Sequence, residues 1–135
     1  MGVTLEDDIH FRYEIDVERH VVLATFFGDA SLTDAQAIVA ELYSDPRHSP
    51  SMGRVYDCRA VTRMPPVVEL RAVADLFQRN VDPAVRVRRA IVVAPGAYYG
   101  LGRMLQALLD LVGLEVSLFT ELDEAIAWVS GHAVS

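Results

Sequence analysis

The chain has 135 residues, of which 52% are hydrophobic and 23% charged, so one domain can bury an ordinary core without disulfides or metals. Its formal net charge is −7, which argues against a nucleic-acid-binding protein because such proteins need a basic face. All 12 basic residues other than histidine are arginines, so a Schiff-base lysine and a P-loop lysine are both excluded.

The amino-terminal residues are acidic and lack the apolar core of a secretory signal. No apolar run approaches the roughly 18 residues that a membrane span needs. A single cysteine, Cys58, cannot form an internal disulfide and suits a reducing compartment. We therefore expect one cytoplasmic domain over residues 1–135, with no membrane span and with flexible ends at 1–8 and 131–135.

The first elements in chain order are predicted to be a hairpin and a helix. Apolar residues in segments 10–15 and 20–27 lie on either side of a polar turn, which is typical of an antiparallel strand pair. Ser31 and Thr33 are alternative N-caps for the helix that follows, and Thr33 with Gln36 would form a capping box. An Asp-Pro pair at positions 45–46 ends this helix.

The middle of the chain predicts a short strand over 54–58, a loop, and a second helix that starts at Pro65-Pro66. A continuous β-branched run over 90–94 then has the pattern of a strand buried on both faces. From Leu101 the apolar residues recur at helical spacing, and Gly113 has the position of a C′ glycine.

The chain ends in a predicted strand over 115–119 and a predicted helix over 122–129. The resulting order is β-β-α-β-α-β-α-β-α, with strands and helices alternating after the hairpin. This order predicts an α/β fold whose mixed, mostly parallel sheet has right-handed crossovers.

Four strings occur in this order along nearly the whole chain. LYSDP closes the first helix at 42–46, Tyr56-Asp57 ends the third strand, YGLGRM opens the third helix at 99–104, and EAIAW lies in the last helix at 124–128. Together they resemble the bacterial STAS-like proteins of the SpoIIAA-like family. The resemblance implies a STAS-like fold and a non-enzymatic regulator that acts through protein–protein contact, with a partner or as a homodimer.

In the anti-sigma-factor antagonists of this group, a partner kinase phosphorylates a serine or threonine in the turn before the second helix. The corresponding turn here, 58–66, has no Asp-Ser pair, and Thr62 is its only hydroxyl. The resemblance therefore implies Thr62 as the candidate phosphorylation site. Other relatives bind lipids or small ligands in an apolar cleft, so a binding module with a cleft between the second and third helices is the alternative function.

Candidate ligand-binding residues lie around the start of the third helix. Tyr98, Tyr99 and Arg103 would bind an anion there, since a helix N-terminus and an arginine fork both favour negative charge. The alternative is that Arg103 pairs with a carboxylate while the tyrosines pack on the sheet edge. Asp57, with Arg59 beside it, would be a carboxylate at the mouth of the cleft, or would order the loop by hydrogen bonds to backbone N–H groups.

Catalytic chemistry has little support in the sequence. Cys58 as a nucleophile needs a base, and the four scattered histidines place none beside it, so a small buried side chain is the default interpretation. These histidines also lack zinc-ligand spacing. No nucleotide-binding fingerprint is matched by the glycines at 96, 100 and 102. We interpret Gly100 and Gly102 as allowing close packing of the helix on the sheet. We expect no catalytic residue, metal or cofactor.

Two further groups of residues each have two possible roles. Arg86, Arg88 and Arg89 precede a strand and are expected to be a solvated edge or a partner contact. Leu109 and Leu114 widen the apolar surface of the third helix, which either supports a dimer or packs into the core.

Overall fold

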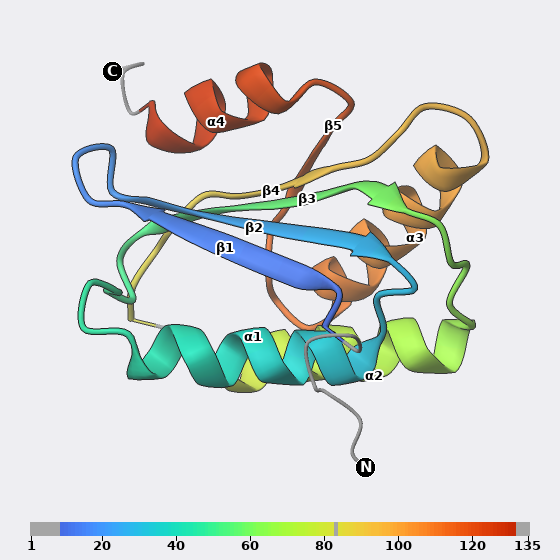
Figure 1. Cartoon of the computed structure of the whole chain (residues 1–135), viewed down its shortest axis with the longest axis horizontal. Coiled ribbons are helices and arrows are strands. Elements are labelled where there is room, and N and C mark those ends of the chain that lie inside the picture. The colour runs from blue at the N-terminus through green and yellow to red at the C-terminus, as the bar shows by residue number, and fades with distance from the viewer. Residues whose placement is uncertain (1–8, 83, 132–135) are drawn as a thin grey trace, which may run out of the picture.

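The computed structural model describes residues 9–82 and 84–131 (Figure 1). The predicted flexible ends fall outside these residues except for Gly131, which caps the last helix. Nine elements follow in the predicted order: β1 (Phe11–Asp16), β2 (Val21–Gly28), α1 (Leu32–Ser44), β3 (Gly53–Val61), α2 (Val67–Arg79), β4 (Arg89–Val92), α3 (Ala97–Leu111), β5 (Ser117–Phe119) and α4 (Leu122–Ser130). The predicted α/β class and mixed sheet are confirmed.

The five strands form one sheet in chain order, β1-β2-β3-β4-β5. β1 is antiparallel to β2, and every later pair is parallel. Because each crossover moves to the next strand in the same direction, a common handedness brings α1, α2 and α3 to the same side. The carboxyl ends of β2, β3 and β4 consequently meet at one edge of the sheet.

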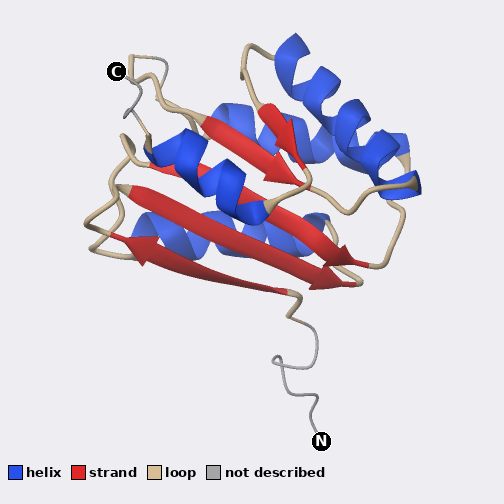
Figure 2. Cartoon of the chain, turned by 90° about the horizontal axis from the view of Figure 1, so that it is seen from above, coloured by secondary structure: helices blue, strands red, loops and turns tan. Residues whose placement is uncertain are grey.

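The helices are unequally divided between the two faces. α1 and α2 cover one face, and α3 packs beside α2 against β4 and β5 (Figures 1 and 2). α4 alone covers the opposite face, where Ala125 and Val129 pack on Val21, Val55 and Val92. The thicker side, with three helices, is where a cavity has room to form.

The start of α1 uses a different cap from the predicted Thr33–Gln36 box. Ser31 is the N-cap, and the buried Asp34 carboxylate accepts its backbone N–H at 2.9 Å. The second oxygen of Asp34 accepts the His10 N–H at 2.8 Å. One carboxylate thus caps the helix and ties it to the residue before β1, a tertiary role that Gln36, which is exposed, does not have.

Several boundaries differ from the sequence prediction, including β4, which ends at Val92, and β5, which starts at Ser117, and two of the differences have a clear structural reason. β3 continues to Val61 because the end of β2 still pairs with it after an irregularity near Phe27. α3 begins four residues before Leu101, after Gly96, whose φ of 95° favours glycine. Its first turn carries no apolar stripe, so the periodicity could not place it.

Gly102 explains how closely α3 approaches the sheet. A Cβ at this position would lie 2.9 Å from Val93 Cγ1 and 3.0 Å from Leu118 Cδ1. The predicted role of Gly102 in close packing is therefore confirmed. Gly100 has no atom within 4 Å of such a Cβ, so that prediction is wrong for Gly100, which faces away from the sheet.

Candidate functional site

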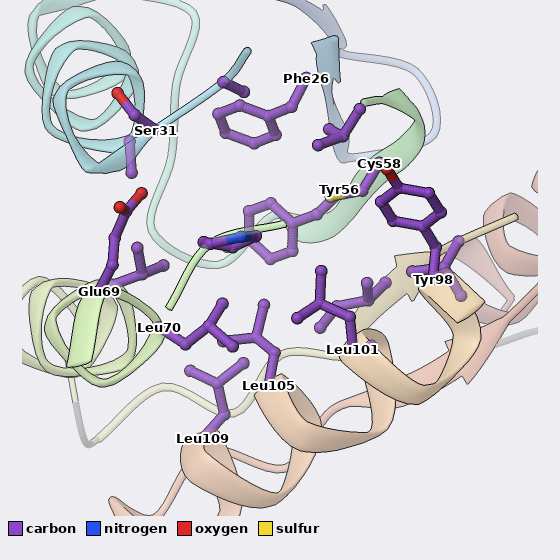
Figure 3. A pocket seen from close by; sticks show the side chains of 18 of the residues that line it. Phe26, Ser31, Tyr56, Cys58, Glu69, Leu70, Tyr98, Leu101, Leu105 and Leu109 are labelled. Atoms are coloured by element: carbon purple, nitrogen blue, oxygen red, sulfur yellow. The ribbon is translucent and has the colours of Figure 1, made fainter. Parts of the chain in front are cut away.

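An apolar cavity of about 120 Å³ lies between the sheet and helices α1, α2 and α3, towards the carboxyl ends of the parallel strands (Figure 3). Such edges are where α/β proteins commonly bind ligands. Its apolar lining includes Phe26, Tyr56, Leu70, Leu101, Leu105 and Leu109.

The stripe from α3 forms one wall of the cavity. Leu101, Leu105 and Leu109 are spaced four residues apart, so they lie along one face of the helix and point into the cavity (Figure 3). Leu101 and Leu105 belong to the apolar stripe predicted from the sequence, whereas Leu109 was expected to widen it; Leu109 and Leu114 are both buried, which favours the core alternative over the dimer alternative for these two residues. Opposite them, the Tyr56 ring stacks on Phe77 with centroids 5.1 Å apart and an interplanar angle of 20°.

The Cys58 thiol also lines the cavity. Burial, with a smaller contribution from the negative charge of Asp57, raises the pKa of this thiol to about 12. It is therefore protonated at neutral pH and lacks the thiolate that nucleophilic attack requires. This agrees with the interpretation of Cys58 as a small buried side chain.

One side of the cavity rim is closed by an ion pair. Arg63, in the loop after β3, donates to both carboxylate oxygens of Glu69 on α2, one at 2.6 Å. The Glu69 carboxylate also accepts the Leu32 N–H at 3.1 Å, while Arg63 donates to the Ala30 carbonyl at 3.3 Å. These four contacts join the start of α1, the β3–α2 loop and α2. The pairing with Arg63 lowers the pKa of Glu69.

The other side of the rim is closed by a single hydrogen bond. The Tyr98 hydroxyl, in the first turn of α3, donates to the Thr62 carbonyl at 2.9 Å. The Thr62 N–H in turn donates to the Gly28 carbonyl at 2.9 Å. Tyr98 thus links α3 to the β3–α2 loop while its ring faces the cavity beside Cys58 (Figure 3).

The five predicted ligand-binding residues do not come together at this site. Only Tyr98 lines the cavity. Asp57 lies two residues after Val55, which packs under α4, so it is on the opposite face of the sheet. Its carboxylate accepts the backbone N–H and the side chain of Arg59, at 3.1 and 2.9 Å. This is the loop-ordering arrangement given as the alternative for Asp57, although here it lies within β3.

Tyr99 and Arg103 are also outside the cavity. Both are exposed, and Arg103 borders a shallow polar groove with Gln106, Asp110 and Glu115. Tyr98 therefore points into the molecule while Arg103, on the same helix, faces solvent. The structure places no shared anion position between them.

Sequence reasoning missed the residues that close the rim. Glu69 and Arg63 are six residues apart across the Pro65-Pro66 pair, a separation that brings side chains into contact in neither a helix nor a strand. Only the fold brings them together. Leu105 and Phe77 were assigned to apolar stripes, but no sequence signal separates a stripe that fills a core from one that leaves a cavity.

Two ionisable groups that face the cavity are already paired or neutral. The Glu69 carboxylate is committed to Arg63, and the Cys58 thiol is protonated. Within residues 9–82 and 84–131, no cluster of three or more His, Cys, Asp or Glu side chains could hold a metal ion. In the same residues no helix is both long and apolar enough to cross a membrane. The cavity is also smaller than the several hundred Å³ of typical cofactor pockets.

In comparisons with known proteins, no family model matches the chain and no curated protein sequence matches it. The resemblance to STAS-like proteins therefore stays a prediction, and the functional argument rests on the geometry of the cavity.

Proposed function

We propose that this chain is a non-enzymatic module that binds a small, mostly apolar molecule in the cavity between α1, α2, α3 and the sheet. One observation carries the proposal: an apolar cavity lies at the carboxyl ends of the parallel strands, with its few polar groups at the rim. The buried thiol of Cys58, protonated and unpaired, supports a location in the reducing cytoplasm.

The volume sets the size of the ligand. A cavity of about 120 Å³ is close to the roughly 150 Å³ apolar cavity that accepts benzene in an engineered protein. A single aromatic ring, a short branched chain or the end of an acyl chain would fit, whereas a nucleotide would not. Ser31, Glu69 and Tyr98 lie among the residues around it, so a polar end of the ligand would lie at the rim.

The cavity is partly open to solvent. An apolar molecule that fills it would shield the lining side chains from water, which is favourable. Binding at 100 times the Kd would raise the free energy of unfolding by about 2.7 kcal/mol, which is several degrees in Tm.

The test combines native mass spectrometry of freshly purified protein with thermal unfolding in benzene and phenol. We expect a co-purified small molecule, or a Tm that rises in a saturable way with either probe. The variant Ala35→Leu adds three carbon atoms to a side chain that lines the cavity. It should raise the Tm of the free protein and remove the response to both probes.

The matched control is Ala40→Leu, at an exposed position of the same helix. It should respond to the probes like the unsubstituted protein. An unsubstituted protein that carries no molecule after purification and shows no saturable response to either probe would overturn the proposal.

A second function is favoured by a separate observation. Three large hydrophobic side chains near Thr62 are exposed, Met64, Val67 and Val68, the last with 75% of its surface in contact with solvent. Exposed apolar groups of this kind mark protein contacts when they lie together. We propose that this segment contacts a protein partner or a second copy, as the STAS-like resemblance implies, with phosphorylation of the exposed Thr62 as the regulatory event.

Intact mass tests the phosphorylation directly. Co-expression with kinases of the host should add one phosphate to the chain, and Thr62→Ala should lose it. Light scattering on the unsubstituted protein and on Val68→Ser should show a complex that the substitution weakens. A mass that never changes, together with a monomer at high micromolar concentration, would contradict both parts of this second function.

A further inference from the structure

Two buried arginines lie side by side at the end of the sheet opposite to the cavity. Arg54 begins β3 and Arg89 begins β4, and the two residues are direct neighbours in the parallel register. Only 7% of Arg54 and 9% of Arg89 is exposed. This corrects the sequence interpretation of residues 86–89 as a solvated edge, because Arg86 and Arg88 are exposed but Arg89 is not.

Neither guanidinium has a carboxylate partner in the described part of the chain, where the ion pairs that form involve other arginines. Arg54 Nη2 lies 3.0 Å from His48 Nε2. The Tyr56 hydroxyl lies beside Arg89. Both partners are neutral, since burial and the charge of Arg54 lower the pKa of His48, and burial raises the pKa of Tyr56.

The carboxylate that influences His48 is already occupied. Asp45 influences His48, but both of its oxygens accept hydrogen bonds from Arg47, at 2.8 and 3.1 Å, and one also accepts the Tyr13 hydroxyl at 3.0 Å. Among the described residues, two positive charges therefore lie together in the protein interior without a carboxylate to neutralise them. Guanidinium groups do not deprotonate in proteins, so the repulsion cannot be relieved by losing a proton. Buried charges are normally paired.

The unpaired donors can be reached from solvent. In the described residues, every fully buried side-chain nitrogen or oxygen has a hydrogen-bond partner. Guanidinium N–H groups without a partner must then belong to the small exposed fraction of Arg54 and Arg89. The open surface of this cluster is thus made of charged N–H donors, next to His48.

We propose that Arg54 and Arg89 bind a small tetrahedral oxyanion, either inorganic phosphate or the phosphate group of a monoester. Neighbouring strands are about 4.8 Å apart, so the two forks start close enough for one anion to accept hydrogen bonds from both. The anion supplies the negative charge that the surrounding residues lack. This site is separate from the cavity, and it takes the opposite class of ligand.

The experiment follows the Nε–Hε NMR signals of the arginines during titration with sodium phosphate, with chloride keeping the ionic strength constant. The signals of Arg54 and Arg89 should shift together in a saturable way. Arg54→Met and Arg89→Met should each weaken phosphate binding at least about tenfold, the loss of one charge-assisted contact. Arg71→Met, at an exposed position of α2, makes the same charge change and should keep full affinity.

A parallel titration with glycerol phosphate separates the two sources of the phosphate group. Tighter binding of inorganic phosphate supports the free ion, and tighter binding of the ester supports a phosphorylated molecule. Ala35→Leu, which fills the cavity, should leave either titration unchanged. If the variants fail to fold, the shifts of the Arg54 and Arg89 signals in the unsubstituted protein test the proposal by themselves. Shifts that are absent, or that all 12 arginines share equally, overturn the proposal.

Discussion

The two edges of the sheet differ in what they leave incomplete. At the carboxyl edge, apolar side chains from three helices and three strands surround a space of about 120 Å³ that they do not fill. At the amino edge, Arg54 and Arg89 are buried but remain without a counter-charge in the described residues. The side chains leave unfilled space at the carboxyl edge, and they leave positive charge without a counter-charge at the amino edge.

This comparison shows why ligands of two classes are inferred for one small domain. Filling an apolar void and neutralising a buried charge are different physical problems, and no single molecule of the size that fits the cavity solves both. Tyr56 lies between them, with its ring lining the cavity and its hydroxyl beside Arg89. The comparison also predicts that equal substitutions at the two edges have unequal effects on stability.

The largest effect is expected at the cavity wall. Leu109→Ala removes a fully buried side chain and enlarges the cavity, so it should lower the free energy of unfolding by about 3–4 kcal/mol. Urea denaturation measures the change. Leu111→Ala is the control on the same helix, with Leu111 74% exposed, and should cost less than about 0.5 kcal/mol. Equal losses in the two variants would show that Leu109 does not support the core.

A smaller effect tests how α3 approaches the sheet. Gly102→Ala places a methyl group 2.9 Å from Val93 Cγ1, so it should destabilise the protein by about 1–3 kcal/mol and change the cavity shape. Gly100→Ala meets no atom and should be stabilising by up to about 1 kcal/mol through helix propensity. Thermal unfolding of both variants shows whether each substitution lowers or raises the Tm. Destabilisation by Gly100→Ala would contradict the assignment of its direction.

At the amino edge, by contrast, substitution of a buried side chain should not lower the free energy of unfolding. Arg89→Met removes one of two like charges and keeps an apolar side chain of similar length. In chloride buffer it should leave the free energy of unfolding unchanged or raise it by up to about 2 kcal/mol. Urea denaturation with and without phosphate measures this. A loss above about 1 kcal/mol in chloride would show that Arg89 already has the stabilising partner that the structure lacks.

The smallest effect concerns pH at the cavity rim. Arg63 lowers the folded-state pKa of Glu69, so the pair stabilises the protein above the unfolded-state pKa of about 4.3. That stability is lost as the pH falls through the lower, folded-state value. Glu69→Gln should therefore be less stable than the unsubstituted protein at pH 7, with the difference shrinking in strong acid.

Urea denaturation between pH 2 and 7 measures this dependence, and Asp75→Asn, an exposed substitution on the same helix, is the control. If the difference in free energy of unfolding between Glu69→Gln and the unsubstituted protein stays constant over this range, the Arg63–Glu69 pair does not contribute pH-dependent stability.

Most of the fold could be predicted because each element carries its own local signal. The run over 90–94 reports burial directly, since its first four residues are buried. The helical spacing from Leu101 predicted α3 but not which side chains face inward, because Leu111 is 74% exposed whereas Leu109, which widens the predicted stripe, is buried. The missed details depend on partners distant in sequence. β3 extends to Val61 because β2 is still beside it, and the first turn of α3 follows from Gly96 rather than from any apolar period.

The candidate site could be predicted only in part. A cleft between the second and third helices was expected only as the alternative function, and Tyr98 was named as an anion ligand at the start of the third helix. The pairing of Arg63 with Glu69, and the register that places Arg54 beside Arg89, arise from tertiary packing. Charged residues at such separations give no periodic signal in the sequence. The contacts of the charged residues at both edges therefore could not be predicted from the sequence pattern.

Binding of an apolar molecule in the cavity is the central claim, and methyl NMR during a benzene titration tests it most directly. The methyl signals of Leu101, Leu105 and Leu109 should shift in a saturable way, while those of Val21 in β2 and Val129 in α4, on the opposite face of the sheet, should not. In Ala35→Leu the shifts should vanish. Methyl signals that stay still, or that move equally on both faces of the sheet, would contradict the claim.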